Sequence, residues 1–297
     1  MAYVVLAHKE PELLAAPAPV LLHIDSATSR TTYRWMVTGL PEQVRLLPRR
    51  RSRWGGFGQV LAELDGLAAA AALDVDHVAV LTGQDFPLVA AGHIGAFSAA
   101  HTGRSFFATF PVPTPFWERG GGLRRFRHYN LALGRPFPVR RLRVPARRSP
   151  PAGVALRGGS PYHLLAADHV RAVLAYCNAR PDVLRFWRTV WAPDESFLPS
   201  VLHSCVPAQE IINENLWFID WPAAGGAHPR VLDLSDAPAL ADAVTSGADT
   251  GGRARTKLFA RKLDSTTSAD LLAVLRRRVT TDAQGQAHVP PAPTDGR

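Results

Sequence analysis

Residues 58 to 87 decide the fold, and they read GQVLAELDGLAAAAALDVDHVAVLTGQDFP. From Gly58 to Leu73 the apolar side chains recur three or four positions apart, a spacing that predicts an amphipathic helix. The apolar run from His77 to Leu81 follows at once and predicts a buried strand, which Gly83 and Pro87 bring to an end. A helix that leads directly into a buried strand is the repeating unit of an α/β fold.

The same alternation continues on both sides of this stretch. Upstream, apolar runs predict strands at 3–7, 20–24 and, more weakly, 44–47; downstream we expect a helix at 93–100 and a strand at 105–110. Strand, helix and strand in this order favour right-handed crossovers. We therefore predict an α/β protein with a mostly parallel central sheet and helices on both faces.

The second half of the chain is interrupted before the pattern resumes. Residues 111–158 are rich in proline, glycine and arginine, and they predict a long basic loop region. Beyond it we expect strands at 162–165, 217–219 and 258–259, and helices at 167–178, 183–190, after 193 and at 268–279. A single domain over residues 1–279 is predicted, with a disordered tail at 280–297.

The composition excludes several classes of protein. The chain has 297 residues, 46% of them hydrophobic, and two cysteines, so disordered, collagen-like and disulfide-stabilised proteins are excluded. No run approaches the ~18 apolar residues of a membrane helix, and we expect a cytoplasmic protein without a transmembrane segment. Both thiols, Cys177 and Cys205, are predicted to be reduced and packed.

The charge is positive and comes almost entirely from arginine. Lysine and arginine number 34 against 25 acidic residues, a net charge of +9, and lysine occurs only at positions 9, 257 and 262. A positive field favours anionic partners such as nucleotide phosphates, acidic polymers or nucleic acid. Charge alone does not choose among them.

Three loops converge on one edge of the predicted sheet. Ligands of open α/β sheets bind beyond the carboxyl ends of the strands, where the loops at His8, Asp25 and Gly83 fall. The pair Asp74 and Asp76 matches the Asp-x-Asp pattern of many metal-dependent nucleotide-sugar enzymes. Because that pair precedes its strand, it falls at the opposite edge, and a solvated turn is the favoured reading.

Basic residues near the carboxyl end offer fixed cations for a diphosphate. Charge builds on a diphosphate as it leaves a sugar, and guanidinium and ammonium groups neutralise it in place of a metal. The adjacent Arg261 and Lys262 suit this role, although a solvated basic strand end explains the charge equally well. The cluster consists of Arg253, Arg255, Lys257, Arg261 and Lys262.

Two further segments carry candidate chemistry. Asp194 lies at a predicted helix start and is explained by ordinary helix capping, whereas Glu195 is the better candidate for a general base. Aromatic and basic residues alternate at 117–118 and 124–129. This pattern is compatible with stacking on a sugar, with binding of RNA, or with a loop that has only a structural role.

Taken in order, these segments resemble the core-2/I-branching β-1,6-N-acetylglucosaminyltransferase family, which includes the peptide O-xylosyltransferases. The resemblance covers roughly residues 2 to 265. Singly the motifs are weak, but their order and spacing are specific. The segments are Ala7–Lys9, His23–Asp25, Trp54–Gly56, Leu81–Leu88, Gly158–Ser160, Pro193–Glu195, Asn215–Trp221 and Phe259–Lys262.

The resemblance implies a GT-A-type, Rossmann-like fold, a UDP-sugar donor, inversion at the anomeric carbon, and no metal or other cofactor. By likeness, Glu195 is the catalytic base. The donor is contacted by His8, Asp25, Trp54, Asp85, Arg261 and Lys262, and the acceptor by Glu118, Arg124, Arg127 and Trp217.

The predicted function is therefore transfer of N-acetylglucosamine from a UDP-sugar to a saccharide, glycoside or glycolipid-precursor acceptor, with no nucleic acid as partner. Xylose is the alternative donor sugar, because the stretches at 195–197 and 259–262 resemble the xylosyltransferases. An alternative of another class is a non-catalytic protein that binds nucleic acid or another polyanion through its net positive charge.

Overall fold

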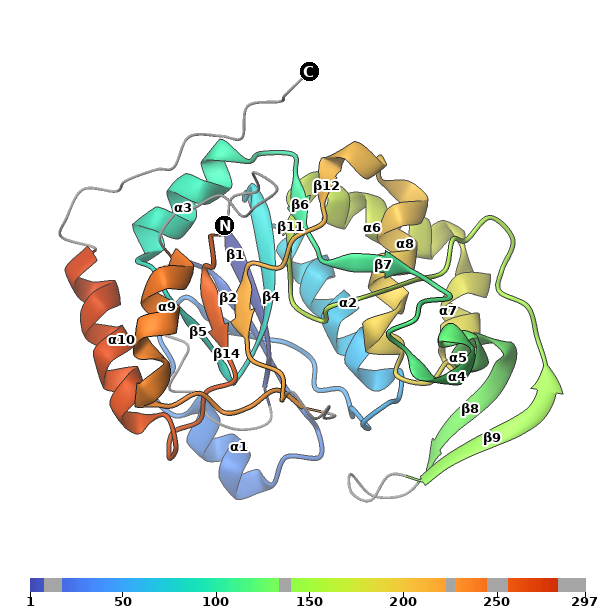
Figure 1. Ribbon diagram of the computed structural model, residues 1–297, viewed down its shortest axis with the longest axis horizontal. Coiled ribbons are helices and arrows are strands. Elements are labelled where there is room, and N and C mark those ends of the chain that lie inside the picture. Colours follow the sequence, from blue (N-terminus) through green and yellow to red (C-terminus); the bar gives the residue numbers. More distant parts are fainter. Residues whose placement is uncertain (8–17, 134–139, 223–227, 245–255, 283–297) are drawn as a thin grey trace.

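A seven-stranded sheet crosses the molecule (Figure 1). The computed structural model describes residues 1–7, 18–133, 140–222, 228–244 and 256–282. In this sheet only β11 runs opposite to the other strands. The α/β class and the mostly parallel sheet are confirmed. Its strands, in spatial order, are β12 (Ile211–Ile212), β6 (Ser105–Phe106), β11 (His163–Ala166), β4 (His77–Thr82), β1 (Ala2–Ala7), β2 (Val20–Ile24) and β3 (Val44–Leu46).

Helices cover one face of this sheet with a continuous apolar core. Alternate strand residues such as Val4, Val78 and Val80 face this layer, because side chains alternate across a strand. The buried Trp187 and Phe197 fill the space behind them. The layer consists of α2 (Gly58–Ala70), α6 (Ala167–Ala179), α7 (Pro181–Trp187) and α8 (Phe197–Cys205).

The other face carries four helices and a small second sheet. The remaining side chains of β1, among them Tyr3 and Val5, pack here. The small sheet has the order β13 (Trp217–Ile219), β14 (Phe259–Arg261) and β5 (Asp85–Pro87). Its far side forms a third apolar cluster. The helices on this side are α1 (Arg30–Val37), α3 (Ala91–Ala100), α9 (Ala237–Val244) and α10 (Ala269–Asp282).

One glycine allows α2 to approach the sheet closely. A Cβ added at Gly66 would lie 2.3 Å from a methyl carbon of Val4. We expect Gly66→Ala to lower the free energy of unfolding by about 1–2 kcal/mol, because overpacking outweighs the better helix propensity of alanine. Urea denaturation measures this. Gly95→Ala on α3 is the control, since no atom lies within 4 Å of its added Cβ; it should stabilise the protein, and equal effects of the two changes would contradict the packing argument.

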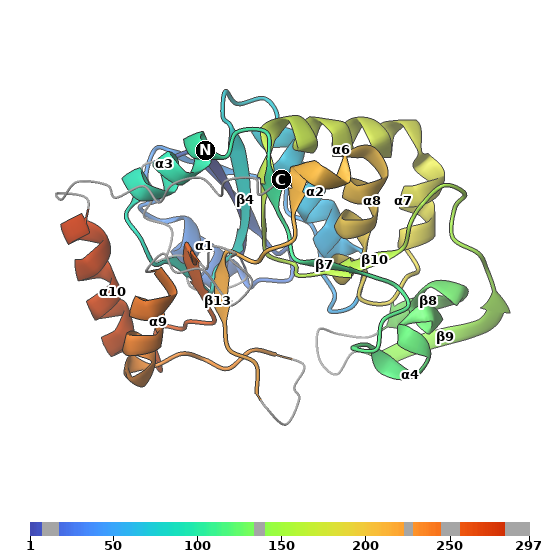
Figure 2. The ribbon, with the colours of Figure 1, turned by 45° about the horizontal axis from the view of Figure 1, so that its top comes forward.

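The region from 111 to 158 is not the long loop that the sequence predicts. It contains α4 (Glu118–Gly121), α5 (Leu123–Arg127) and the antiparallel hairpin of β8 (His128–Leu133) and β9 (Arg140–Arg147). These elements form a lobe beside α7 (Figures 1 and 2). Leu131 and Leu142, opposite each other in the hairpin, are both exposed, so no buried apolar stripe reveals the strands in the sequence.

Other boundaries also differ from the prediction. The expected strand at 105–110 divides into β6 and β7 (Thr109–Pro111), and β7 pairs with β10 (Arg157–Gly159) in a separate two-stranded sheet. The last helix extends to Asp282, into the predicted tail, while 283–297 lie outside the described residues.

Cys177 and Cys205 are free thiols, as predicted. None of the helices in the described ranges is long and apolar enough to span a membrane.

Candidate active site

The carboxyl ends of β1, β2 and β4 meet at one edge of the sheet, as the sequence predicts. His8, just past β1, lies outside the described residues. Asp25, just past β2, accepts hydrogen bonds from the backbone N–H groups of Ala27 (2.6 Å) and Ser52 (2.9 Å). Its carboxylate therefore ties the loop after β2 to the segment that leads to Trp54.

The Trp54 loop packs against the loop that carries Glu195. The rings of Trp54 and Trp191 meet edge to face at 5.4 Å, and the N–H of Ala192 donates to the carbonyl of Gly55 at 3.1 Å. Gly55 has a φ of +70°, and a Cβ there would lie 3.0 Å from the Trp191 ring. Glycine is required at this contact, and Trp54 remains 44% exposed at the edge of the site.

Glu195 lies in a short 3₁₀ helix, η2 (Pro193–Glu195), and is held by one arginine. The Nη1 atom of Arg125 donates to its Oε2 at 2.5 Å, and the guanidinium of Arg125 stacks 4.0 Å from the ring centroid of Trp117. The side chain of Glu195 is 39% exposed against 11% for Arg125. Within the described residues its Oε1 makes no hydrogen bond. One oxygen is thus oriented from the protein side and the other is open to a ligand.

The neighbouring Asp194 is in a different electrostatic environment. Burial, followed by the charge of Glu195, raises the pKa of Asp194 from 3.8 to about 7. A carboxyl whose pKa is raised on folding destabilises the folded state as it ionises, so stability falls as the pH rises from about 4 through about 7.

We expect Asp194→Asn to remove this pH-dependent loss of folding stability, because asparagine does not ionise. At pH 8 the variant should be more stable than the wild type by about 2 kcal/mol, or about 5 °C in Tm, whereas at pH 4 the two should be nearly equal. Thermal unfolding followed between pH 4 and 9 measures the difference. A stability difference that does not vary with pH would show that ionisation of Asp194 is not its cause.

On the opposite side of the site, Arg261 is paired with Asp85. The two residues face each other in the register of β14 and β5, and Nη1 of Arg261 lies 3.1 Å from Oδ1 of Asp85 and also donates to the Thr82 hydroxyl. Oδ2 of Asp85 accepts from the Thr82 N–H at 2.5 Å. The Asp85 side chain is fully buried and that of Arg261 is 11% exposed. Asp85 thus orients Arg261 and has no surface of its own for a donor.

Lys262, the next residue, has a fixed backbone and an uncommitted ammonium group. Its carbonyl accepts from the N–H of Leu232 at 2.9 Å. Among the described residues its side chain makes no hydrogen bond or ion pair. Lys257, by contrast, donates to the carbonyl of Asn215.

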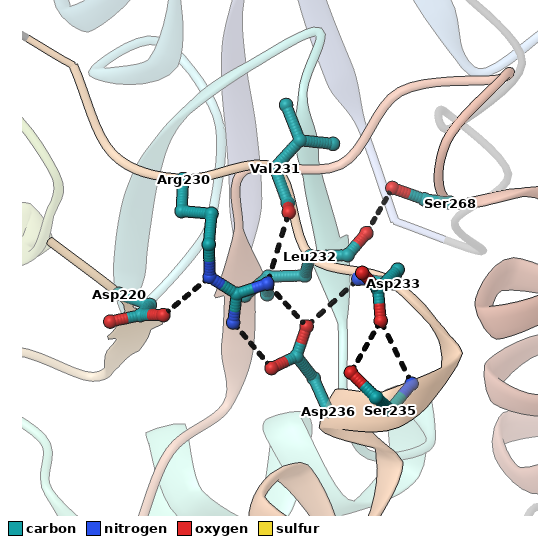
Figure 3. A network of polar contacts seen from close by, with 8 residues as sticks. All are labelled: Asp220, Arg230, Val231, Leu232, Asp233, Ser235, Asp236 and Ser268. Carbon is teal, nitrogen blue, oxygen red and sulfur yellow. Dashed lines mark hydrogen bonds and ion pairs between the residues drawn. The ribbon is translucent and has the colours of Figure 1, made fainter. Parts of the chain in front are cut away.

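A polar network holds the segment that contacts Lys262 (Figure 3). The hydroxyl of Ser268 donates to the carbonyl of Leu232 at 2.6 Å. The guanidinium of Arg230 binds Asp220 at 2.7 Å and Asp236 at 2.5 Å. The backbone at Leu232, and with it the backbone at Lys262, is therefore anchored from several directions.

Tyr162 connects the two sides of the site. The guanidinium carbon of Arg261 lies 4.4 Å from its ring centroid. Burial raises the pKa of Tyr162, Arg261 opposes this, and both Asp85 and Asp194 raise it further. Because charges affect a pKa strongly only at short range, Tyr162 lies near the carboxylates of both Asp85 and Asp194, the latter being the neighbour of Glu195.

The structure places the four predicted acceptor residues in different environments. Arg124 and Arg127 are exposed and line a pocket of about 400 Å³ together with Arg143 and Arg147. Glu118 begins α4, but the placement of its side chain lies outside what the structure describes. The prediction for Trp217 is wrong: its side chain is 2% exposed and stacks on Phe259 at 4.8 Å between the central and small sheets, where an acceptor cannot reach it.

Sequence reasoning missed Arg125 and Tyr162 as site residues. Arg125 is one of several arginines in its segment, and no local signal distinguishes the one that contacts Glu195.

Asp74 and Asp76 are exposed at the edge opposite the site, where they were expected. Over the described ranges, no three histidine, cysteine, aspartate or glutamate side chains cluster as metal ligands would.

Comparison with known proteins identifies the family. The chain is similar in structure to 2-C-methyl-D-erythritol 4-phosphate cytidylyltransferase from Francisella tularensis, with 8% identity and a TM-score of 0.35 over 81% of this chain and 98% of that one. No curated protein matches. The family model for the Core-2/I-Branching enzyme matches residues 20–239, a span that includes Asp25, Trp54, Asp85 and Glu195. The chain therefore belongs to the Core-2/I-Branching enzyme family, which is a family of glycosyltransferases.

Proposed function

We propose that the protein is an inverting glycosyltransferase that moves N-acetylglucosamine from a UDP-sugar to an acceptor hydroxyl without a metal ion. Two features carry this proposal: Glu195 is held through Oε2 by Arg125 with Oε1 open, and a cationic segment at Arg261 and Lys262 includes an uncommitted ammonium.

In the proposed reaction, Glu195 accepts the proton of the acceptor hydroxyl. The acceptor oxygen attacks the anomeric carbon from the face opposite UDP, and the bond from that carbon to the diphosphate oxygen breaks. Arg125 keeps the carboxylate in the orientation that this attack requires.

The leaving diphosphate gains negative charge, which Lys262 and, to a smaller extent, Arg261 neutralise. The charge of Arg261 is already balanced by Asp85. Lys262 is the stronger candidate for this role because the described residues hold no counter-ion for it. Arg261 is held by Asp85 and Thr82, and the backbone of Lys262 is anchored by Leu232, so the cationic segment needs little reorganisation as the charge develops.

The position of the acidic residues supports the absence of a metal from the proposed mechanism. Asp74 and Asp76 lie at the far edge of the sheet, and the Asp85 carboxylate is committed to Arg261 and Thr82. We expect transfer to proceed unchanged in EDTA, as measured by release of UDP. Activity that EDTA abolishes and manganese restores would contradict the metal-free mechanism.

A panel of UDP-sugars tests the donor. N-acetylglucosamine is the expected sugar, and xylose is the alternative that the stretches at 195–197 and 259–262 favour by their resemblance. UDP should raise the Tm of the protein, since a ligand that binds only the folded state stabilises it. Salt-sensitive binding of nucleic acid with no response to UDP would instead favour the polyanion-binding alternative.

A further inference from the structure

Four arginines line one pocket in the lobe formed by α4, α5, β8 and β9. Arg124 and Arg127 come from α5, whereas Arg143 and Arg147 come from β9. Arg124 and Arg127 are three positions apart, so they share one side of the helix. The register of the hairpin places Arg147 opposite His128, where α5 passes into β8. We call this pocket the arginine pocket.

The strand that carries Arg143 and Arg147 is anchored at its end to the helical layer. Arg148, next to the pocket in sequence, donates to the carbonyl of Phe186 at 2.8 Å and to the Thr189 hydroxyl at 2.7 Å. Its guanidinium carbon lies 4.0 Å from the centroid of the Phe186 ring, and burial lowers its pKa to about 10. Arg148 therefore anchors the end of β9 to the helical layer as a structural residue.

The four pocket arginines have no such role. Within the described part of the chain, none of their guanidinium groups donates a hydrogen bond or forms an ion pair. Four like charges around one pocket of about 400 Å³ repel one another, and this repulsion destabilises the folded lobe. His128 also lines the pocket, and its Nδ1 is buried without a hydrogen-bond partner among the described groups. An anion would relieve the repulsion and supply acceptors.

The pocket lies beside the proposed catalytic base. Arg125, between Arg124 and Arg127 on α5, is the residue that holds Glu195. The arginine pocket therefore shares one short helix with the residue that holds Glu195. An acceptor whose hydroxyl reaches Glu195 can place a second group in the pocket.

We propose that the arginine pocket binds a phosphate or carboxylate group of the acceptor, so that the enzyme selects anionic glycoconjugates over neutral ones. This inference rests on the proposed function. Guanidinium forks bind such groups through paired, charge-assisted hydrogen bonds. The anion fixes the acceptor at a point remote from the reacting hydroxyl and so contributes to its orientation.

Titration with inorganic phosphate and pyrophosphate tests the pocket directly. We expect the wild-type protein to bind these ions by calorimetry, and Arg143→Gln/Arg147→Gln to raise the Kd about ten-fold or more. The matched control is Arg45→Gln/Arg104→Gln, which removes the same charge from exposed positions on β3 and before β6. Equal affinity in the pocket variant, or an equal loss in the control, would overturn the proposal.

UDP binding separates this proposal from the proposed function. Arg143→Gln/Arg147→Gln should bind UDP as the wild type does; a loss would show that the pocket belongs to the donor site and would overturn the inference. If the wild type does not bind UDP, the proposed function fails, yet the phosphate titration still reports on the pocket.

Two sources of the anion are distinguished by competition. One arm uses soluble sugar phosphates and uronates beside their neutral parent sugars, and the other uses phosphatidylcholine vesicles with and without phosphatidylglycerol. The proposal is supported if a compound or vesicle of either arm displaces pyrophosphate from the wild type but not from Arg143→Gln/Arg147→Gln. The arm in which this happens identifies the source of the anion. No displacement in either arm would contradict it.

Discussion

Glu195→Gln should lower turnover by about 100-fold or more while leaving the affinity for UDP unchanged. Glutamine keeps the size of the side chain, and its carbonyl can still accept the hydrogen bond from Arg125, which is 2.5 Å long in the wild type. It cannot accept the proton of the acceptor hydroxyl. Turnover is measured by UDP release at saturating donor, and UDP affinity by calorimetry.

The control for this experiment is Glu42→Gln, because Glu42 is exposed on the loop before β3 and outside the site. It should behave as the wild type in both measurements. Near-normal turnover of Glu195→Gln would rule out Glu195 as the base, and a parallel loss of UDP affinity would assign it to donor binding instead.

Lys262→Gln should have the second largest effect, weakening UDP affinity about ten-fold and lowering kcat/KM by about 100-fold. The larger effect on kcat/KM follows because the charge of the diphosphate grows in the transition state, so a fixed cation stabilises that state more than the bound donor. Arg261 does not compensate, since Asp85 already balances its charge.

Lys257→Gln is the matched control, because it removes the same charge five positions earlier. The ammonium of Lys257 is bound to the carbonyl of Asn215. We expect this variant to lose stability without losing UDP affinity. Equal losses of UDP affinity in the two variants would indicate a general effect of positive charge and contradict a specific role of Lys262.

Much of the fold could be predicted because its signals are local. The apolar runs of β1, β2 and β4 and the periodicity of α2 each lie within a few residues, and they predict these elements without reference to the rest of the chain. The lobe could not be predicted in this way. Its hairpin exposes Leu131 and Leu142, and its arginines are typical of a loop by composition.

The candidate site was predictable as a set of loops but not as a set of contacts. Trp217 lies in a segment that resembles an acceptor region, yet pairing of β13 with β14 buries its side chain against Phe259. Asp85 and Arg261 were both expected to contact the donor. The structure pairs them with each other, which leaves Lys262 as the more available cation.

The sequence by itself determined the alternating α/β sheet, the edge at which the loops meet and the family to which the chain belongs, because each depends on local patterns and their order. Only the tertiary structure decided which charges neutralise one another. Arg125 meets Glu195 and Arg261 meets Asp85 across 70 and 176 residues of chain. Such pairs depend on strand register and packing that no local pattern encodes, and they determine which cations remain for a ligand.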